Sequence, residues 1–453
     1  MTKTKTALLT EYASSTAFAA LPEAVIDRTK KVIFDEIACA YFGRRSAAGD
    51  LSARYARDAS GAAGGEARIY GTRLSVSAPF AALANGTAGH GEEVDGAHVV
   101  GGHPGASIVH AAMAMAERQR TTGAELINAV ALGYDVGIRI VAACGGKFVV
   151  RDTHHITSDS FYTFGATAAA SRLLGLDAPR TAHALALASF QTNGLYALYS
   201  EKRHISKSFC NGQYAFAGVS AAIMSMTGLE GNEDIMGSSQ GLLTAWGAEG
   251  KAEELVRAFG TEFSILGANF KFFNAGYPIH TPVEAAMTLI AEHGLSGDDI
   301  AAVTVGMAEN TRRVVDGRAM HNICVQDMVA ASIATGGLEI LDQPFPAILR
   351  EPAYQRLRAC IEVEVDPEIQ RDLPDGRGAR VTITTTDGRT LSKRVDHPRG
   401  HSRRGEVSWD DLAEKWTRSL PNCDVATALT VARTLESLDD VTTLAKAFAG
   451  EMV

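Results

Sequence analysis

The sequence contains little cysteine and carries no excess of positive charge. Six cysteines are scattered through 453 residues, and no two of them form a C-x-x-C pair. This spacing excludes the common structural zinc motifs and indicates a reduced, intracellular protein, so we expect a cytoplasmic location. The 43 lysines and arginines are outnumbered by 52 aspartates and glutamates, which gives a formal net charge of −9. We therefore expect no nucleic-acid partner bound through many phosphate contacts.

We expect no segment in this sequence that directs the chain to a membrane. The first 22 residues contain early lysines and many small residues, but Thr10, Glu11, Tyr12 and two serines interrupt any apolar core. We therefore expect no signal peptide. The longest uncharged run, 208–229, is rich in glycine, alanine and serine and has polar residues near its beginning. This composition predicts a buried helix and not a membrane span, so no membrane partner is expected.

Several widespread catalytic motifs are absent or lack their usual context. The sequence has no G-x-x-x-x-G-K-[ST] loop, no G-x-G-x-x-G after a predicted strand and no H-E-x-x-H pair. Residues 237–241, GSSQG, match G-x-S-x-G, but the segment before them is polar and no α/β alternation surrounds it. A nucleophile elbow requires a strand before the serine and a helix after it. Ser239 is therefore not expected to be a hydrolase nucleophile.

Hydrophobic periodicity divides the chain into three parts. Through residues 1–265 apolar residues recur at helical spacing, in segments rich in alanine and glycine. Beyond about 266, apolar and polar residues alternate in three segments, and Asp387-Gly388 provides a hairpin turn. We predict a mainly α protein with a large all-helical domain at 1–265, a smaller α+β lid domain at 266–405, and C-terminal helices at 406–453 that return to the helical domain.

Titratable residues are concentrated in one stretch, HGEEVDGAHVVGGHP, at residues 90–104. It contains three histidines, three carboxylates and four glycines, and it lies between two predicted helices. Loops held by a rigid scaffold often carry function, and clustered titratable groups mark sites. A solvated turn and a metal site are the alternatives, but loop spacing alone specifies no metal ligands. The stretch is our first candidate for an acid–base site.

Two lysines occur in unusual surroundings. Lys207 lies in HISKSFCNG and Lys271 in NFKFFNAGYPIH, each before a predicted helix and among aromatic and small residues. A lysine at the beginning of a helix is a good anion ligand, because the helix amides add to its field. His154 and His155 occupy the same position relative to a third helix, in RDTHHITSDSFYTFGAT. These residues predict a site for a small anion.

Four segments of the chain resemble, in the same order, five motifs of the MmgE/PrpD family, which includes 2-methylcitrate dehydratase, cis-aconitate decarboxylase and iminodisuccinate epimerase. The family's H-x-M-D-F-D-D…HP stretch is similar to residues 90–104, which puts Glu93 and Asp95 at two aspartate positions and His103 in the HP pair. The other matches, in the stretch before FGAT, in KSFCNG and in KFFNAGYPIH, fall on His155, Lys207, Lys271 and His280.

The resemblance implies a homodimer with a helical domain and a lid domain, which works without a metal or organic cofactor on small di- or tricarboxylates bound between the domains. The shared step places charge next to a carboxylate, so lysines supply countercharge and histidines carry protons. His103 and His155 are then the acid–base pair and Lys207 the stabilising cation, while Glu93 and Asp95 orient an imidazole or bind a hydroxyl. The expected substrate-binding residues are Lys271, His90, Asp327 and His280.

Several positions depart from the family pattern. Asp327, in CVQDMVA, falls where the family often has a tyrosine, and Cys210 replaces a histidine. Glu93 replaces an aspartate, and Ala97 falls where a hydroxyl residue is common. An ionised aspartate beside the substrate would repel a carboxylate, so we expect Asp327 to change the substrate at that point unless it is protonated, paired with a lysine or turned away.

Three functions remain open. The favoured one is a lyase that dehydrates a 2-hydroxy di- or tricarboxylate, in the manner of 2-methylcitrate dehydratase. The second is an isomerase or epimerase that uses the same proton-transfer groups without a leaving group, with a decarboxylase as a less favoured variant. The third is a metal-dependent hydrolase built on residues 90–104, or a non-catalytic carboxylate-binding protein.

Overall fold

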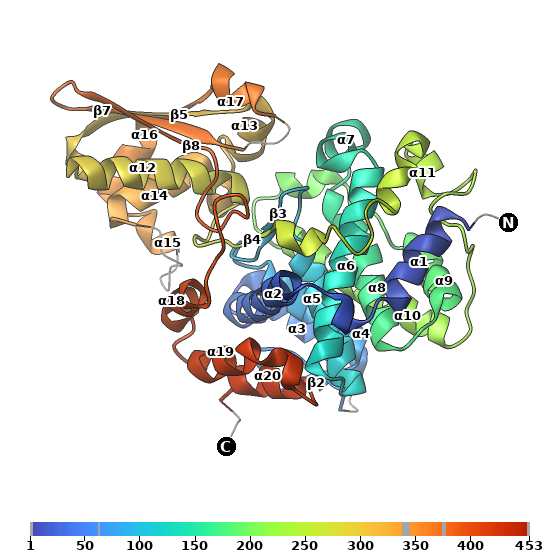
Figure 1. Ribbon diagram of the computed structural model, residues 1–453. Coiled ribbons are helices and arrows are strands. Elements are labelled where there is room, and N and C mark those ends of the chain that lie inside the picture. The colour runs from blue at the N-terminus through green and yellow to red at the C-terminus, as the bar shows by residue number, and fades with distance from the viewer. Residues whose placement is uncertain (1–2, 62–63, 338–344, 374–376, 451–453) are drawn as a thin grey trace. The chain divides into compact units, whose positions relative to one another are not determined.

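The computed structural model describes residues 3–61, 64–337, 345–373 and 377–450. This part of the chain divides into two compact units. The first contains the residues up to 198, residues 204–269 and the residues from 408 onward, and the second contains 199–203 and 270–407. Helices predominate and the sheets are small (Figure 1), which confirms the predicted mainly α fold.

The first unit is built almost entirely from helices. Two short antiparallel ladders join its loops: β1 (Ala67–Arg68) pairs with β2 (Ser75–Val76), and β3 (Ala97–His98) pairs with β4 (Ala268–Asn269). The helices that precede the second unit are α1 (Lys5–Ser15), α2 (Glu23–Gly43), α3 (Ala47–Ser60), α4 (Ala78–Gly89), α5 (Pro104–Gln119), α6 (Gly123–Ala143), α7 (Gly146–His154), α8 (Tyr162–Leu173), α9 (Ala178–Ser189), α10 (Ser206–Met226) and α11 (Leu242–Ala245).

Small residues allow these helices to pack closely. α10 packs against α4, α8 and α9. Where α10 crosses α4, a Cβ on Gly86 would lie 3.0 Å from the Cα of Gly212, and where α6 meets α8, a Cβ on Gly165 would lie 2.6 Å from the carbonyl oxygen of Gly133. A side chain at either position would crowd the neighbouring helix, so glycine permits the close approach. The α4–α10 crossing brings the end of α4 beside the beginning of α10, where the candidate site lies.

The first unit also contains an apolar helix that could be taken for a membrane span and the G-x-S-x-G match. α6 is long and apolar enough to cross a membrane by length and composition, but most of it is buried against other helices. Ser239 lies in a run of turns and bends at 233–241, with no strand directly before it. The G-x-S-x-G match therefore lacks the strand–turn–helix context of a nucleophile elbow.

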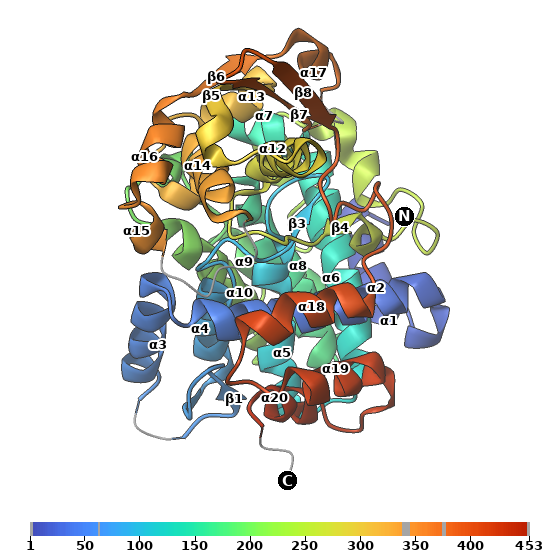
Figure 2. The same ribbon diagram turned by 90° about the vertical axis from the view of Figure 1, so that its left-hand side faces the viewer.

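The last helices of the chain belong to the first unit. They are α18 (Trp409–Ser419), α19 (Val425–Arg433) and α20 (Thr442–Phe448). α18 and α19 both pack against α2, and α19 packs against α20 (Figure 2). The indole of Trp416 is fully buried and donates to Asp35 Oδ1 at 2.7 Å. The C-terminal segment therefore contributes to the core behind the candidate site.

The second unit contains a four-stranded sheet in the order β6-β5-β7-β8. β5 is parallel to β6 and antiparallel to β7, and β7 and β8 form the hairpin predicted at Asp387-Gly388. α12 packs against β7, β8 and α14, and α14 packs against α16. The elements are β5 (Ile300–Met307), β6 (Ile361–Val365), β7 (Ala379–Thr385), β8 (Thr390–Val395), α12 (His280–His293), α13 (Glu309–Val315), α14 (Val325–Thr335), α15 (Phe345–Ile348), α16 (Pro352–Ala359) and α17 (Pro367–Arg371).

Candidate active site

Residues 90–104 form an ordered connection from α4 to α5. His90 is the C-cap of α4, β3 pairs with β4 in the middle of the connection, and His103 is the N-cap of α5. The backbone N–H of His103 donates to Asp159 Oδ1 at 2.6 Å. Gly102 has a φ of 72°, and a Cβ there would overlap the same Asp159 oxygen. Glycine is therefore required at 102, and Asp159 fixes the point at which His103 enters the helix.

Asp95 lies between two histidine rings. Its Oδ2 is 2.8 Å from Nδ1 of His90 and 3.1 Å from Nδ1 of His103, which is also 2.9 Å from the carbonyl oxygen of Gly96. Because both neighbours of the His103 Nδ1 are acceptors, this nitrogen carries the proton, and the lone pair of the neutral ring is on Nε2. The His103 side chain is 11% exposed, whereas those of His90 and Asp95 are fully buried. His103 is therefore the ring of this pair that a substrate can reach.

Lys207, in the first turn of α10, joins His90 to Glu93. Its Nζ lies 2.5 Å from Nε2 of His90 and forms an ion pair with Oε1 of Glu93. The same Glu93 oxygen is 2.8 Å from Nε2 of His204, and Nδ1 of that ring is 2.7 Å from the hydroxyl of Ser208. The lysine and the glutamate neutralise each other inside a buried network, which also ties α10 to residues 90–104.

Burial and charge act in opposite directions on the histidines of this network. Burial alone would lower the pKa of His90, but the Asp95 carboxylate outweighs it and raises that pKa. For His204, burial and the Lys207 ammonium lower the pKa to about 4, so this ring is neutral at pH 7. Because His204 is neutral, Lys207 is the cation that pairs with Glu93.

Glu93 has an unusual backbone conformation. Its φ of 54° lies in the left-handed region, which residues other than glycine seldom adopt. The side chain that this conformation directs inward is fully buried and bonds both Lys207 and His204. Strain of this kind persists where surrounding contacts hold it, and it is concentrated at functional sites.

Three residues of the site were missed by the sequence analysis. His204 and Ser208 bracket Lys207 in HISKSFCNG, and their i,i+4 spacing at the beginning of a helix is a signal that would have linked them. Asp159 is 56 residues from His103 in sequence. No local sequence pattern predicts that contact, because it forms only when α5 and α8 pack against each other.

The structure does not join His155 to this network. The residue is the C-cap of α7, with a left-handed φ of 56° and an exposed side chain. Its backbone carbonyl accepts from the Tyr196 N–H at 2.7 Å. Within the described ranges, no hydrogen bond connects its ring to His103, so the acid–base pairing of the two histidines stays a prediction.

Two further predicted residues, Lys271 and His280, belong to the second unit and are buried there. His280 begins α12, its Nε2 lies 3.2 Å from the carbonyl oxygen of Ala275, and its ring stacks on Tyr277 with centroids 5.8 Å apart. Their roles in substrate binding remain predictions.

Asp327, in the first turn of α14, is also in the second unit, and both of its carboxylate oxygens are engaged. Arg358 of α16 forms an ion pair with Oδ1, and Nδ1 of His321 lies 2.5 Å from Oδ2. The expectation that Asp327 repels a substrate carboxylate assumed that no cation compensates its charge. With Arg358 and His321 against it, Asp327 links three segments of the second unit and its charge is neutralised locally.

Two groups of three residues bring possible ligand atoms within 4.8 Å of one another: His90, Asp95 and His103, and His90, Glu93 and His204. Nitrogen and carboxylate ligands of this kind suit divalent metals such as zinc. The nitrogens concerned, however, already bond carboxylates or Lys207, and Lys207 places a positive charge against the second group. We assign none of these residues as a metal ligand, and metal independence stays a prediction.

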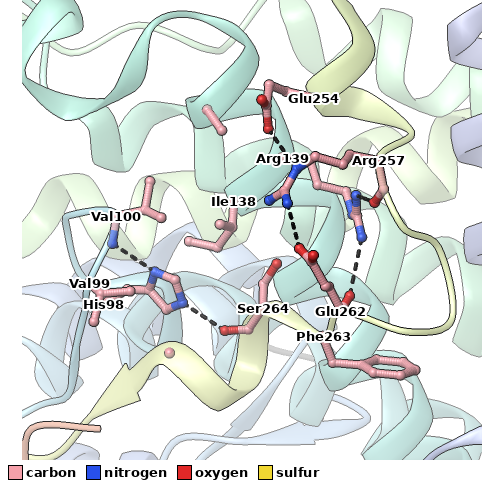
Figure 3. A pocket seen from close by; sticks show the side chains of 12 residues that line it. His98, Val99, Val100, Ile138, Arg139, Glu254, Arg257, Glu262, Phe263 and Ser264 are labelled. Atoms are coloured by element: carbon pink, nitrogen blue, oxygen red, sulfur yellow. Dashed lines mark hydrogen bonds and ion pairs between the residues drawn. The ribbon is translucent and has the colours of Figure 1, made fainter. Parts of the chain in front are cut away.

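The third histidine of residues 90–104, His98, lies in a different environment. Its Nε2 donates to the carbonyl of Ser264 at 2.7 Å, and its Nδ1 accepts from the Val100 N–H at 3.1 Å (Figure 3). Burial lowers its pKa to about 4. It lines a pocket of about 240 Å³ in which Arg257 pairs with Glu254 and Glu262. His98 is therefore a neutral, fully bonded ring beside a pocket of balanced charge.

The first unit thus carries an Asp–His pair and a buried Lys–Glu pair at the beginnings of two helices. Residues 7–255 match the MmgE/PrpD N-terminal domain, and residues 273–436 match the MmgE/PrpD C-terminal domain. The chain belongs to the MmgE/PrpD family, as the motifs predicted.

Curated relatives extend over most of the chain. Cis-aconitate decarboxylase from Homo sapiens is 24% identical, over 95% of this chain and 91% of the relative. Cis-aconitate decarboxylase from Aspergillus terreus is 25% identical, over 87% of this chain and 85% of the relative. A 2-methylcitrate dehydratase-like protein from Aspergillus oryzae is 30% identical, but over 35% of each chain. Decarboxylases and dehydratases of this kind are lyases, so the chain is similar to lyases along its length.

Proposed function

We propose that this chain is a lyase that transfers a proton at a carbon next to a carboxylate of a small di- or tricarboxylate, without a metal or organic cofactor. The observation that carries the proposal is the Asp95–His103 pair at the N-terminus of α5. Asp95 and the Gly96 carbonyl hold the proton of His103 on Nδ1. The reacting nitrogen is then Nε2, and the aspartate stabilises the imidazolium that forms when Nε2 takes a proton.

The surroundings of His103 favour an anionic substrate. The residue caps the N-terminus of α5, and Lys207 lies in the first turn of α10. The dipoles of the two helices direct their positive ends toward this region, while the charge of Lys207 is balanced by Glu93. Negative charge that develops beside a substrate carboxylate would be stabilised by these positive ends, which is the role a Lewis acid would otherwise have.

Two reactions can use these groups, and they differ in whether His103 removes a proton from the substrate carbon or delivers one to it. In dehydration, Nε2 removes a proton from the carbon next to a carboxylate, the C–H electron pair forms the new double bond, and the hydroxyl leaves as water after taking a proton. In decarboxylation, the bond to the departing CO₂ breaks, its electron pair is delocalised toward a remaining carboxylate, and protonated His103 delivers a proton to carbon. His103 is thus a base in the first reaction and an acid in the second.

The relatives favour decarboxylation as the reaction to test first. Similarity to cis-aconitate decarboxylases covers most of the chain, whereas similarity to the dehydratase-like protein covers about a third. Dehydration of a 2-hydroxy tricarboxylate, which the motifs alone suggested, is the second candidate. An epimerase would use the same proton transfer without a leaving group.

The test is a panel of cis-aconitate, 2-methylcitrate, citrate and aspartate-like dicarboxylates, read by CO₂ release, alkene absorbance and proton NMR. We expect one of the tricarboxylates to lose CO₂ or water, at a rate that prolonged chelation does not change. Inversion or hydrogen exchange without loss of a group would establish an epimerase. Loss of activity on chelation and recovery with zinc would overturn the metal-independent mechanism.

We also propose that the protein is a cytoplasmic homodimer. Support comes from the family resemblance and from scattered free cysteines, which suit a reducing compartment. Light scattering at micromolar concentration should give twice the mass of one chain, and a monomeric mass would contradict the proposal.

A further inference from the structure

Helix α2 buries two adjacent carboxyl groups behind residues 94–96. Asp35 and Glu36 are each 1% exposed. The backbone N–H of Gly96 donates to Glu36 Oε1 at 3.2 Å, and the carbonyl of the same residue is 2.9 Å from Nδ1 of His103. One residue, Gly96, therefore connects the buried glutamate to the proposed proton carrier.

The two carboxyl groups differ in how their charge is compensated. Asp35 Oδ1 accepts from Lys415 Nζ of α18 at 2.7 Å, and that Nζ also donates to the Val94 carbonyl at 3.2 Å. Glu36 has no lysine or arginine partner among the described residues. The nearest basic group is Nε2 of His110, in α5, at 4.0 Å. Asp35 is thus a paired carboxylate, whereas Glu36 forms no ion pair with a lysine or arginine in the described part of the chain.

Polar atoms on both sides of the Glu36–His110 gap are unsatisfied. Glu36 Oε2 and both ring nitrogens of His110 are buried without a hydrogen-bond partner in the described part of the chain. A carboxylate buried without a cation, beside Asp95 and Asp35, would cost several kcal/mol. Burial and these two carboxylates raise the pKa of Glu36 well above its ordinary value, and burial lowers the pKa of His110 to about 3. The raised pKa favours the protonated, uncharged form of Glu36, and the lowered pKa keeps the His110 ring neutral at pH 7.

We propose that Glu36 is a positioning residue for the Asp95–His103 pair, and that it holds Gly96 as a neutral carboxylic acid whose hydroxyl faces His110. In this state it accepts the Gly96 N–H, and so fixes the carbonyl that orients His103, without bringing another negative charge to Asp95. The inference rests on the proposed role of His103 in proton transfer. It explains why an acidic side chain can be buried here without a cation.

Titratable groups face Glu36 from several elements. Burial raises the pKa of the Cys39 thiol and of the Tyr134 hydroxyl, so both stay uncharged at neutral pH. The groups around Glu36 are Asp35 and Cys39 from α2, Asp95 from residues 90–104, His110 from α5, Tyr134 from α6 and Lys415 from α18.

The experiment compares Glu36→Gln, which keeps a neutral acceptor and donor, with Glu36→Leu, which removes both. Glu117→Gln is the matched control, because Glu117 is also a buried carboxyl that accepts a backbone N–H, but from Arg68. The first readout is the titration of the His103 ring, followed by NMR in histidine-labelled protein, which needs no substrate. We expect an unchanged midpoint in Glu36→Gln and in the control, and a midpoint lowered by roughly half a unit or more in Glu36→Leu.

The kinetic readout uses whichever acid the protein turns over. Glu36→Leu should lower kcat by about tenfold or more with a smaller change in KM, and Glu36→Gln should recover most of that loss. Unchanged kcat and unchanged titration in Glu36→Leu would overturn the positioning role. A lowered His103 midpoint in Glu36→Gln would show that Glu36 carries a charge, and would overturn the neutral form.

An infrared measurement keeps the proposal testable if Glu36→Leu does not fold. The difference spectrum between wild type and Glu36→Gln at pH 8 should contain the C=O stretch of one protonated carboxyl group. A carboxylate band in its place would overturn the proposal. Because the infrared and NMR readouts need no turnover, they separate a failure of this inference from a failure of the proposed lyase activity.

Discussion

Asp95 and Glu93, two residues apart in the same loop, have different roles. Asp95 contacts two imidazole rings and sets the tautomer of His103, whereas Glu93 neutralises Lys207. Sequence motifs placed these residues in one site, because their types and order are those of a known family. They could not assign the partners, since the contact between His204 and Glu93 forms only when the beginning of α10 packs against the loop.

At the scale of single residues, we predict that Lys207→Met lowers the free energy of unfolding by about 3–5 kcal/mol, because it leaves Glu93 buried without its cation. Adding Glu93→Gln should restore most of that stability without restoring activity. Urea denaturation of the single and double variants measures this, with the exposed Lys202→Met as the control. A single variant as stable as wild type would mean that the buried pair does not hold the loop.

Helices and strands with a regular hydrophobic periodicity were predicted from the sequence, whereas irregular turns were not. The uncharged run at 208–229 is largely the buried helix α10 (Ser206–Met226), and the hairpin forms at Asp387-Gly388. In contrast, the exposure of His155 depends on a left-handed turn at the end of α7. That turn is held by a contact with Tyr196, 41 residues later, and no local pattern predicts such a contact.

At the scale of elements, Asp327 joins α14 to α16 through Arg358, and we predict that Asp327→Asn destabilises the second unit by about 1–3 kcal/mol. Relative rates on 2-methylcitrate, citrate and amino-dicarboxylates should stay the same, because the lost charge was already compensated. Thermal unfolding and the rate panel measure the two effects. Changed selectivity with unchanged stability would instead support the original expectation that Asp327 acts on the substrate.

Across the whole molecule, several buried carboxyl groups have raised pKa values for the same physical reason, namely burial. They are Asp35, Glu36, Glu117 and Asp135. Sequence composition gave the net charge of −9 but could not show this, because burial of an acid depends on tertiary packing. For the same reason, no sequence pattern assigned residues 199–203 to the second unit.

These groups predict the pH dependence of stability. Burial raises the pKa of Glu117 from 4.5 to about 7. Between these values the unfolded chain releases a proton that the folded chain keeps, so the free energy of unfolding falls as pH rises, by about 1.4 kcal/mol for each unit of pKa difference. From pH 5 to pH 8, wild type should lose stability relative to Glu117→Gln, and denaturation of both proteins at the two pH values measures this. The histidines whose pKa burial lowers, His98, His110 and His204, act in the opposite direction but equally in both proteins. Equal differences in both proteins would contradict this assignment.

The central claim is that His103 exchanges a proton with a carbon next to a substrate carboxylate. The most direct measurement is proton NMR of cis-aconitate and 2-methylcitrate with the enzyme in D₂O, for wild type and His103→Gln. We predict loss of CO₂ or water by wild type, with deuterium entering at carbon in the decarboxylation, and a rate about 10²–10⁴ lower in the folded variant. Turnover by His103→Gln at the wild-type rate, with the same deuterium content, would contradict the account.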